Sequence, residues 1–184
     1  NGNCFILTTS YRDINLIQIL LSENLKNTGI TIFHQGMGLT RKKLLENFKT
    51  VKNSVLIATS TFWEGVDIPG NSLSLLVITK LPFKVPTSPI FKAKSKSYED
   101  LGKNSFIELS LPGAVLKLKQ GFGRLIRSEN DFGGFFILDN RVVTKFYGKT
   151  FINSLPDMNF KYDNNDNIYN LYKNFLENIY EKNV

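Results

Sequence analysis

The sequence predicts an α/β fold in which a parallel β-sheet carries helices on both of its faces. Short apolar runs, which are typical of strands, alternate along most of the chain with segments of helical periodicity. These runs are apolar at consecutive positions rather than at alternate ones, which indicates strands buried on both sides. The chain has 184 residues, of which 42% are hydrophobic, so it can form one sizeable core.

The first part of the chain is expected to alternate strands and helices. CFILTTS is the first strand, and a helix over 12–27 follows it, with isoleucines and leucines near one face. ITIFHQG is the second strand. A helix over 40–49 begins after Thr40, because a threonine hydroxyl can cap the unpaired N–H groups of a first turn. SVLIATS is the third strand.

LSLLVITKL is the fourth strand, after which a proline-punctuated connection leads into a lysine-rich polar stretch over 92–104. A helix over 111–127 has Ser110 as its expected N-cap and a proline in its first turn, where the missing N–H costs nothing. GGFFILD is the fifth strand. Helical periodicity returns over 166–181. We therefore expect a main domain over 1–156 and a tail over 157–184 that contains a peripheral helix.

The net charge of +7 is unevenly distributed along the chain. Residues 157–184 carry five acidic residues against three lysines, so the excess of positive charge belongs to the main domain. A basic domain suits contact with polyanions such as nucleic acid or nucleotide phosphates. An ordinary solvated lysine surface explains the composition equally well.

Composition also excludes several classes of protein. Cys4 is the single cysteine, so a disulfide framework or a thiolate metal site within this chain is excluded, and Cys4 is expected to pack in the first strand. No apolar run approaches the ~20 residues that a membrane-spanning helix needs, and no signal peptide pattern is visible. A cytoplasmic setting is the expectation. The start at Asn1, without a methionine, suggests a piece of a longer polypeptide.

Two polar segments follow predicted strands directly. STFWEGVDIPG (60–70) follows the third strand and combines a tryptophan, two carboxylates and several turn-forming residues, and TTSY (8–11) follows the first. In parallel α/β sheets ligands bind at the carboxyl ends of strands, so both segments lie where such a fold presents its chemistry. Since STFWEGVDIPG contains neither a nucleophile nor a metal-binding set, we expect it to form one wall of a site.

The sequence QGFGRLIR supplies a candidate for the other wall. On a helix, Gln120, Arg124 and Arg127 fall within about 60° of each other and form a stripe of one amide and two guanidinium groups. Gly121 and Gly123 lie in the same helix, and each costs roughly 1 kcal/mol relative to alanine. A helix tolerates such residues where something must approach its backbone closely. Arginines one turn apart suit phosphate oxygens; the alternative is a solvated surface stripe.

No phosphate-binding loop accompanies these arginines. GKT at 148–150 resembles the end of such a loop, but Val143 stands where the loop requires glycine. GFGRLI begins like a dinucleotide-binding fingerprint, but Ile126 replaces the third glycine and no strand directly precedes it. Arginines without a phosphate loop are what one half of a two-domain NTPase would contain.

Together with VITKLPF and YGKTFINSLP, these motifs closely resemble the C-terminal motor domain of DinG-type helicases, the bacterial relatives of XPD in superfamily 2. The resemblance runs from about Asn3 to Pro156, with TTSY matching helicase motif IV, WEGVDIPG motif V and QGFGRLIR motif VI. It implies a RecA-like fold, the second of two motor domains with ATP bound between them, and single-stranded DNA as a partner. It also implies that ATP and Mg²⁺ are held mainly by the N-terminal helicase domain, so that this chain binds no metal and is inactive alone.

The resemblance assigns roles to individual residues. Arg124 and Arg127 would reach the γ-phosphate of ATP as arginine fingers, with Gln120 beside them. Further residues would lie on the ATP side of the domain, and these are Glu64, Gly65, Asp67 and Gly123. A third group would contact the DNA backbone, and its members are Thr9, Ser10 and Thr59. Trp63 would stack on a base or pack between the domains.

Two other functions compete with a helicase motor domain. A non-catalytic module could bind nucleic acid through the basic face without ATP. A complete small nucleotide enzyme is the third possibility, and the missing phosphate loop weakens it.

Overall fold

The computed structural model describes residues 3–59, 62, 73–127, 131–156, 158, 160–163 and 165–182. Contacts between Cα atoms divide the chain into a larger unit, Asn1–Ser154, and a smaller unit, Leu155–Val184. The smaller unit contains a helix, α7 (Asn165–Lys182). The sheet and every residue of the predicted site belong to the larger unit.

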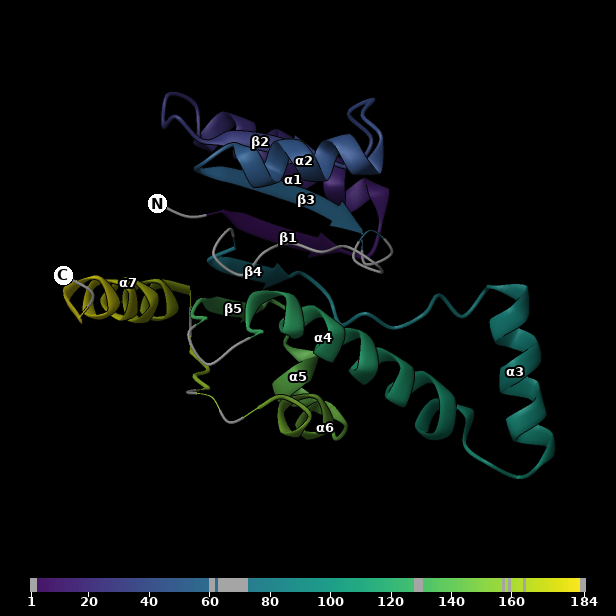
Figure 1. Cartoon of the computed structure of the whole chain (residues 1–184). Coiled ribbons are helices and arrows are strands. Elements are labelled where there is room, and N and C mark those ends of the chain that lie inside the picture. The colour runs from purple at the N-terminus through teal and green to yellow at the C-terminus, as the bar shows by residue number, and fades with distance from the viewer. Residues whose placement is uncertain are drawn as a thin grey trace. The chain divides into compact units, whose positions relative to one another are not determined.

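The larger unit is built on a five-stranded sheet whose strands are all parallel, as the sequence predicted. The strands are β1 (Cys4–Thr8), β2 (Thr31–His34), β3 (Ser54–Thr59), β4 (Leu75–Ile78) and β5 (Gly134–Ile137). They lie in the order β2-β3-β1-β4-β5, so β1 is central and all strands end at the same edge (Figure 1). Every residue of β3 is buried, which explains why its sequence shows no alternation.

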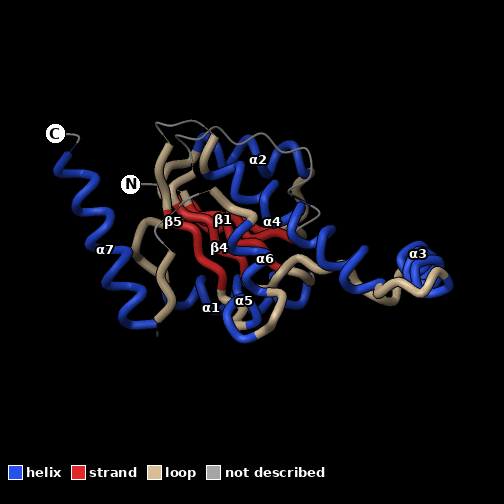
Figure 2. The backbone as a smooth tube through the Cα atoms, turned by 90° about the horizontal axis from the view of Figure 1, so that it is seen from below, coloured by secondary structure: helices blue, strands red, loops and turns tan. Residues whose placement is uncertain are grey.

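Helices cover both faces of the sheet, which confirms the predicted layers. The three longest helices of this unit that pack on the sheet are α1 (Tyr11–Asn24), α2 (Arg41–Thr50) and α4 (Leu111–Leu125). Figure 2 shows α2 and α4 on one face and α1 on the other. Phe48 of α2 and Leu118 of α4 are fully buried, and these side chains attach the two helices to the core.

Of the two N-cap residues predicted from the sequence, Thr40 caps its helix and Ser110 does not. The Thr40 hydroxyl accepts a hydrogen bond from the Lys43 N–H at 3.3 Å, so Thr40 caps α2 as predicted. Ser110 does not cap α4: its backbone is helical, and its side chain makes no capping bond. A π-helical turn, η3 (Phe106–Ser110), runs directly into α4, and the Leu111 N–H donates to the Phe106 carbonyl. A backbone carbonyl of η3 therefore pairs the N–H group at the start of α4, and the Ser110 side chain is not needed as a cap.

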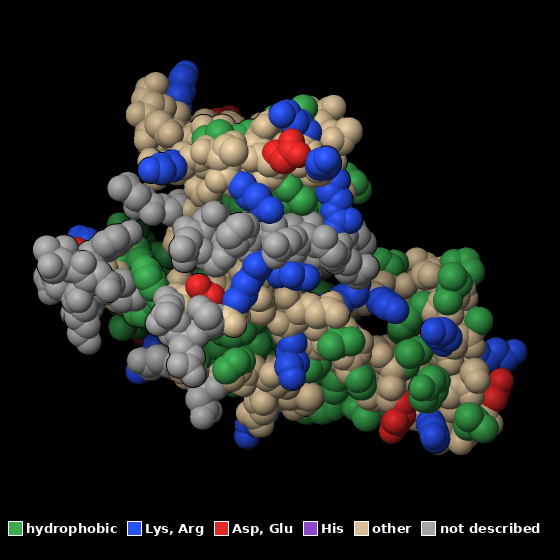
Figure 3. Space-filling view, viewed as in Figure 1, with side chains coloured by type: hydrophobic (Ala, Val, Ile, Leu, Met, Phe, Trp, Pro, Cys, Tyr) green, Lys and Arg blue, Asp and Glu red, His purple; other side chains and the backbone are tan. Residues whose placement is uncertain are grey.

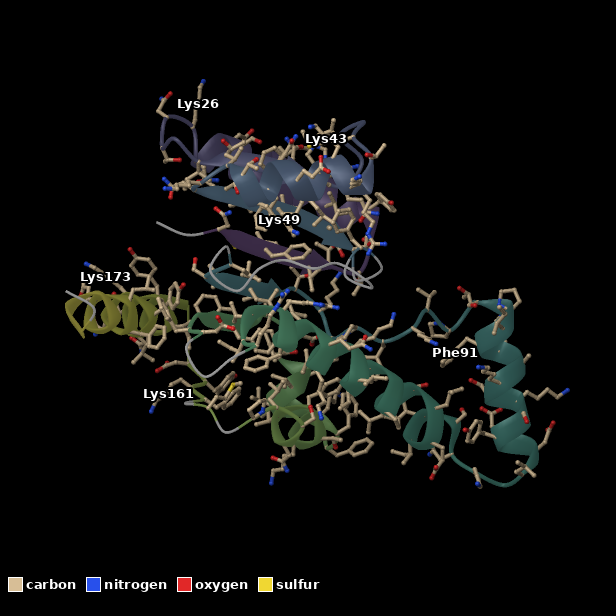
Figure 4. The ribbon with its side chains drawn as sticks, in the orientation of Figure 1. Lys26, Lys43, Lys49, Phe91, Lys161 and Lys173 are labelled. Atoms are coloured by element: carbon tan, nitrogen blue, oxygen red, sulfur yellow. The ribbon has the colours of Figure 1, made fainter. Side chains whose placement is uncertain are left out.

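The lysine-rich stretch is partly helical, although its periodicity predicted no helix. Helix α3 (Pro89–Asp100) begins with a proline in its first turn and contains no fully buried residue. Its half-buried side chains recur at helical spacing, at Phe91, Ser95 and Tyr98. Figure 4 labels Phe91 on this helix. A face with so few apolar residues carries too weak a period to be recognised in the sequence.

Aromatic side chains connect the chain after β4 to the short helices that follow β5, which are α5 (Arg141–Thr144) and α6 (Gly148–Asn153). The Phe83 ring meets the Phe106 and Phe151 rings at centroid distances of 5.7 Å, and the Phe106 and Tyr147 rings are 5.2 Å apart. These contacts fix η3, and with it the start of α4, against α6.

Cys4 lies in β1 and packs against the apolar cluster of Ile14, Val55 and Ile57. Burial raises the pKa of the Cys4 thiol to about 12, so the thiol stays protonated at neutral pH.

Within the described residues, none of the helices combines the length and the apolar character needed to cross a bilayer.

Candidate functional site

The segments TTSY and STFWEGVDIPG leave neighbouring strands at the same edge of the sheet. Thr8 of β1 lies opposite Thr59 of β3 in the parallel register, so the residues from which the two segments start are neighbours. Thr9 is exposed, and the Ser10 hydroxyl accepts a hydrogen bond from the Asp13 N–H at 3.1 Å, which caps α1. The structure thus places Thr59, the residue before STFWEGVDIPG, beside Thr8, the first residue of TTSY, and Ser10 also has a local structural role.

Thr59 is buried, with 7% of its surface exposed, which the sequence did not indicate. Its N–H and its hydroxyl both donate to Gln35 Oε1, at 3.0 Å and 2.9 Å. Gln35 Nε2 in turn donates to the Tyr11 hydroxyl at 2.6 Å. Burial therefore leaves the predicted contact between Thr59 and a DNA phosphate without direct support, and it shows a role for Gln35 that sequence analysis missed.

Arg41, the first residue of α2, was also missed. Its guanidinium donates to the Phe62 carbonyl at 2.7 Å and lies over the Phe62 ring, 5.4 Å from the centroid. An open hollow of about 380 Å³ adjoins these side chains. Its lining residues are Tyr11, Gln35, Gly36, Leu39, Arg41, Leu44 and Phe62, and none of them is acidic.

The QGFGRLIR segment divides between α4 and the chain beyond it. Gln120 is exposed, and Arg124, one turn later, is half-buried on the same side of the helix. Arg124 Nε is buried and has no hydrogen-bond partner within the part of the chain that the structure describes. Gly123 is exposed, and a Cβ added there would meet no described atom within 4 Å. The end of α4 thus combines a guanidinium whose Nε has no partner among the described residues with open space beside Gly123.

Arg127 does not belong to the helical stripe that the sequence predicted. Helix α4 ends at Leu125, and Ile126 is extended, with φ −117° and ψ 113°. The Arg127 N–H donates to Asp131 Oδ2 at 2.8 Å, and its side chain is exposed. Gln120 and Arg124 are one turn apart on α4, as predicted, whereas Arg127 lies beyond the end of the helix.

Four predicted site residues lie outside the described residues, and these are Trp63, Glu64, Gly65 and Asp67. Phe62, directly before them, is described and is 4% exposed.

Basic side chains gather on the face that carries α2 and α4. Figure 3 shows patches of lysine and arginine along this face, with few acidic side chains among them. Figure 4 labels Lys43 and Lys49 on α2. Among the described residues no group of three or more His, Cys, Asp or Glu could hold a metal ion. The charge of this face suits phosphate groups rather than a cation.

Two carboxylates near the strand ends are committed to internal contacts. Lys80 Nζ lies 3.1 Å from Asp13 Oδ2, and this hydrogen bond lowers the pKa of Asp13. Asp139, after β5, accepts hydrogen bonds from the Leu81 N–H at 2.8 Å and from the Arg141 guanidinium at 2.6 Å. Burial alone would raise the pKa of Asp139, but these hydrogen bonds outweigh it and leave the pKa below its usual value. Asp139 is therefore a structural residue that ties the ends of β4 and β5 together.

The lowered pKa of Asp139 predicts a pH-dependent contribution to stability. The contribution is fully present above the unfolded-state pKa of about 3.9 and is lost as the pH falls through the folded-state value. We expect Asp139→Asn to lower the free energy of unfolding by about 1–2 kcal/mol at neutral pH. The difference between the two proteins should shrink below about pH 4. Urea denaturation at neutral pH and at about pH 3 measures it, with the exposed Asp100→Asn as control. A difference that stays constant with pH would contradict this account.

Comparison with protein families identifies a helicase family. The model described as "Helicase C-terminal domain" matches residues 1–158. Among curated proteins, an "ATP-dependent DNA helicase YoaA" of Haemophilus influenzae is 44% identical over 156 residues, which cover 85% of this chain and 24% of that protein. A "3'-5' exonuclease DinG" of Bacillus subtilis is 41% identical over 82% of this chain and 16% of its own length. The chain thus spans about a quarter or less of the length of these relatives.

Solved structures share the fold at lower identity. A chain titled "XPD_APO" superposes with a TM-score of 0.63 at 21% identity, over 88% of this chain and 33% of its own. "Mss116p DEAD-box helicase domain 2 bound to an RNA duplex" gives a TM-score of 0.53 at 14% identity, over 94% of this chain and 56% of its own. The predicted fold, that of a second helicase motor domain, is confirmed by these likenesses.

Proposed function

Because the chain belongs to the helicase C-terminal domain family of DinG and YoaA type, we propose that it acts as the second motor domain of an ATP-dependent DNA helicase. In this role it would supply arginine fingers to ATP held by an N-terminal motor domain and would contact single-stranded DNA. The relatives named as ATP-dependent DNA helicases are about four times as long as the matched region, which leaves room for the other domain.

The end of α4 is the observation that supports this role. A buried polar atom is almost always hydrogen-bonded, yet Arg124 Nε has no partner in the described part of the chain. The missing side chain of Gly123 leaves open space beside it. A phosphate oxygen from a nucleotide held opposite this helix would satisfy the guanidinium, and the glycine would let it come close.

The remaining residues divide between two faces. Arg124 and Arg127, with Gln120, would act on the γ-phosphate by stabilising the charge that spreads over the transferred phosphoryl group. Glu64, Gly65 and Asp67 would join them on the ATP side. Residues of the strand edge would hold the DNA backbone, and these are Thr9, Ser10 and Thr59, with Trp63 nearby.

ATP would enter with Mg²⁺, and the N-terminal domain would be the part of the helicase that holds the metal. Carboxylates are the usual protein ligands of Mg²⁺, and no cluster of them lies among the described residues. The 184-residue chain alone is expected not to turn over ATP.

Binding of the isolated chain to a fluorescent single-stranded oligonucleotide tests the DNA contact. We expect weak binding that falls steeply as salt rises, because only part of the phosphate track is present and each neutralised phosphate releases a counterion. Titrations at low and at physiological salt measure it, with phosphate release followed in parallel. Tight, salt-independent binding would contradict the proposal, and tight binding by a full-length protein without ATPase activity would favour the non-catalytic module. Multiple-turnover phosphate release by the isolated chain, abolished by Arg127→Ala, would overturn the proposal that this chain supplies only one half of the ATP site.

A further inference from the structure

Gln35, directly after β2, uses both ends of its side-chain amide to join two segments of the proposed site. Its Oε1 accepts from the N–H and the hydroxyl of Thr59, where the segment with motif V begins, at 3.0 Å and 2.9 Å. Its Nε2 donates to the hydroxyl of Tyr11, the last residue of TTSY, at 2.6 Å. The Gln35 backbone is itself fixed, because its N–H donates to the Ile57 carbonyl at 2.9 Å.

Arg41 holds the same segment at a second point, three residues further on. Its guanidinium donates to the Phe62 carbonyl at 2.7 Å and covers the Phe62 ring. Phe62 is buried and immediately precedes Trp63 and Glu64 in the sequence. Gln35, which follows β2, thus holds Thr59, and Arg41, which begins α2, holds Phe62. The motif V residues follow Phe62 in the sequence.

We propose that Gln35 and Arg41 are positioning residues that couple the DNA-side segment TTSY to motif V. The proposal rests on the proposed function, because it assigns these contacts to the response of ATP hydrolysis to single-stranded DNA. Nε2 of Gln35 donates to Tyr11, and Oε1 of the same amide accepts from Thr59. A displacement of either partner therefore strains or breaks the hydrogen bonds to the other. Tyr11 is 56% exposed, directly beside the predicted DNA contacts Thr9 and Ser10, so a bound strand can act on it. Arg41 fixes Phe62, the residue that directly precedes the motif V sequence, through its carbonyl and its ring.

A contact that only supports the fold would behave differently. Its loss would lower stability and would reduce activity with and without DNA in the same proportion. Coupling instead predicts that ATP turnover without DNA is kept while the response to DNA is weakened, since the amide acts on the nucleotide side through Thr59.

The test uses full-length protein and measures ATP turnover as a function of single-strand concentration. Gln35→Leu removes all three hydrogen bonds of the side-chain amide at similar size, and Tyr11→Phe removes only the Tyr11 hydroxyl. We expect Gln35→Leu to raise the DNA concentration for half-maximal stimulation about tenfold and Tyr11→Phe to raise it less. Turnover without DNA should change by less than about twofold. The double variant should be no worse than Gln35→Leu, because the Tyr11 hydroxyl acts through Gln35.

Arg41→Lys should also weaken stimulation, because an ammonium cannot both bond the Phe62 carbonyl and stack on its ring. The matched control is Gln18→Leu on α1, where the amide bonds only the exposed Ser22; its DNA response should equal that of the wild type. Unchanged stimulation in Gln35→Leu, or an equal loss of turnover with and without DNA, would overturn the coupling. A wild-type protein whose turnover ignores single-stranded DNA would overturn the proposed function itself, and the coupling with it.

Discussion

Replacing Arg127 by alanine in the full-length helicase is expected to lower DNA-stimulated ATP turnover by about 10³-fold, as the loss of an arginine finger does elsewhere. The reason is that a guanidinium on the γ-phosphate acts mainly in the transition state, when charge spreads over the transferred group. Arg127 is suited to this because its side chain is exposed just beyond the end of α4, while its backbone N–H donates to Asp131 Oδ2 at 2.8 Å. Steady-state phosphate release at saturating DNA measures the effect.

Further variants distinguish two roles for Arg127, an arginine finger on ATP and a contact with DNA. Arg127→Lys should rescue poorly, because an ammonium cannot reproduce the planar fork of the guanidinium. Lys26→Ala, exposed beyond the end of α1, should leave turnover nearly unchanged. Single-strand affinity of Arg127→Ala should stay close to that of the wild type. Normal turnover with lost DNA binding would instead place Arg127 on the DNA track.

Gly148→Ala is expected to destabilise the domain by about 3 kcal/mol, the upper end of the cost of overpacking. A Cβ at Gly148, the first residue of α6, would collide with the Val142 carbonyl, and backbone atoms cannot move aside as a flexible side chain can. Thermal unfolding should show a fall in Tm of about 6–12 °C.

Gly113→Ala is the matched control for this variant. Gly113 lies in the first turn of α4, where a Cβ meets no described atom within 4 Å, so alanine should leave the domain equally or slightly more stable. Equal stability of Gly148→Ala and the wild type would show that the α5–α6 contact is not tightly packed.

The sheet could be predicted because its strands are continuous apolar runs, and the motif segments because they follow strands. The end of α4 could not be, because the sequence after Leu125 contains no helix-breaking residue for several positions. Two contacts beyond the end of the helix leave no mark in the sequence: the Asp131 carboxylate accepts from the Arg127 N–H, and Gly133 packs close to the backbone carbonyl of Ser74, where a Cβ would come within 2.8 Å.

The contacts of Gln35 and Arg41 were invisible in the sequence for a related reason. Gln35 and its partner Thr59 are 24 residues apart, and Arg41 and Phe62 are 21 residues apart. No local pattern connects such pairs; only the parallel pairing of β2 with β3 brings them together. Helix α3 was missed because its inner face contains only two aromatic side chains, Phe91 and Tyr98.

The claim that this domain acts on ATP held by another is tested most directly by a transition-state analogue. The affinities of full-length wild type and Arg127→Ala for ADP and for ADP with aluminium fluoride should be compared in the presence of single-stranded DNA. The account predicts that Arg127→Ala changes ADP affinity by less than about threefold but weakens binding of the aluminium fluoride complex by at least about 100-fold. An equal loss for both nucleotides, or no loss for either, would contradict it.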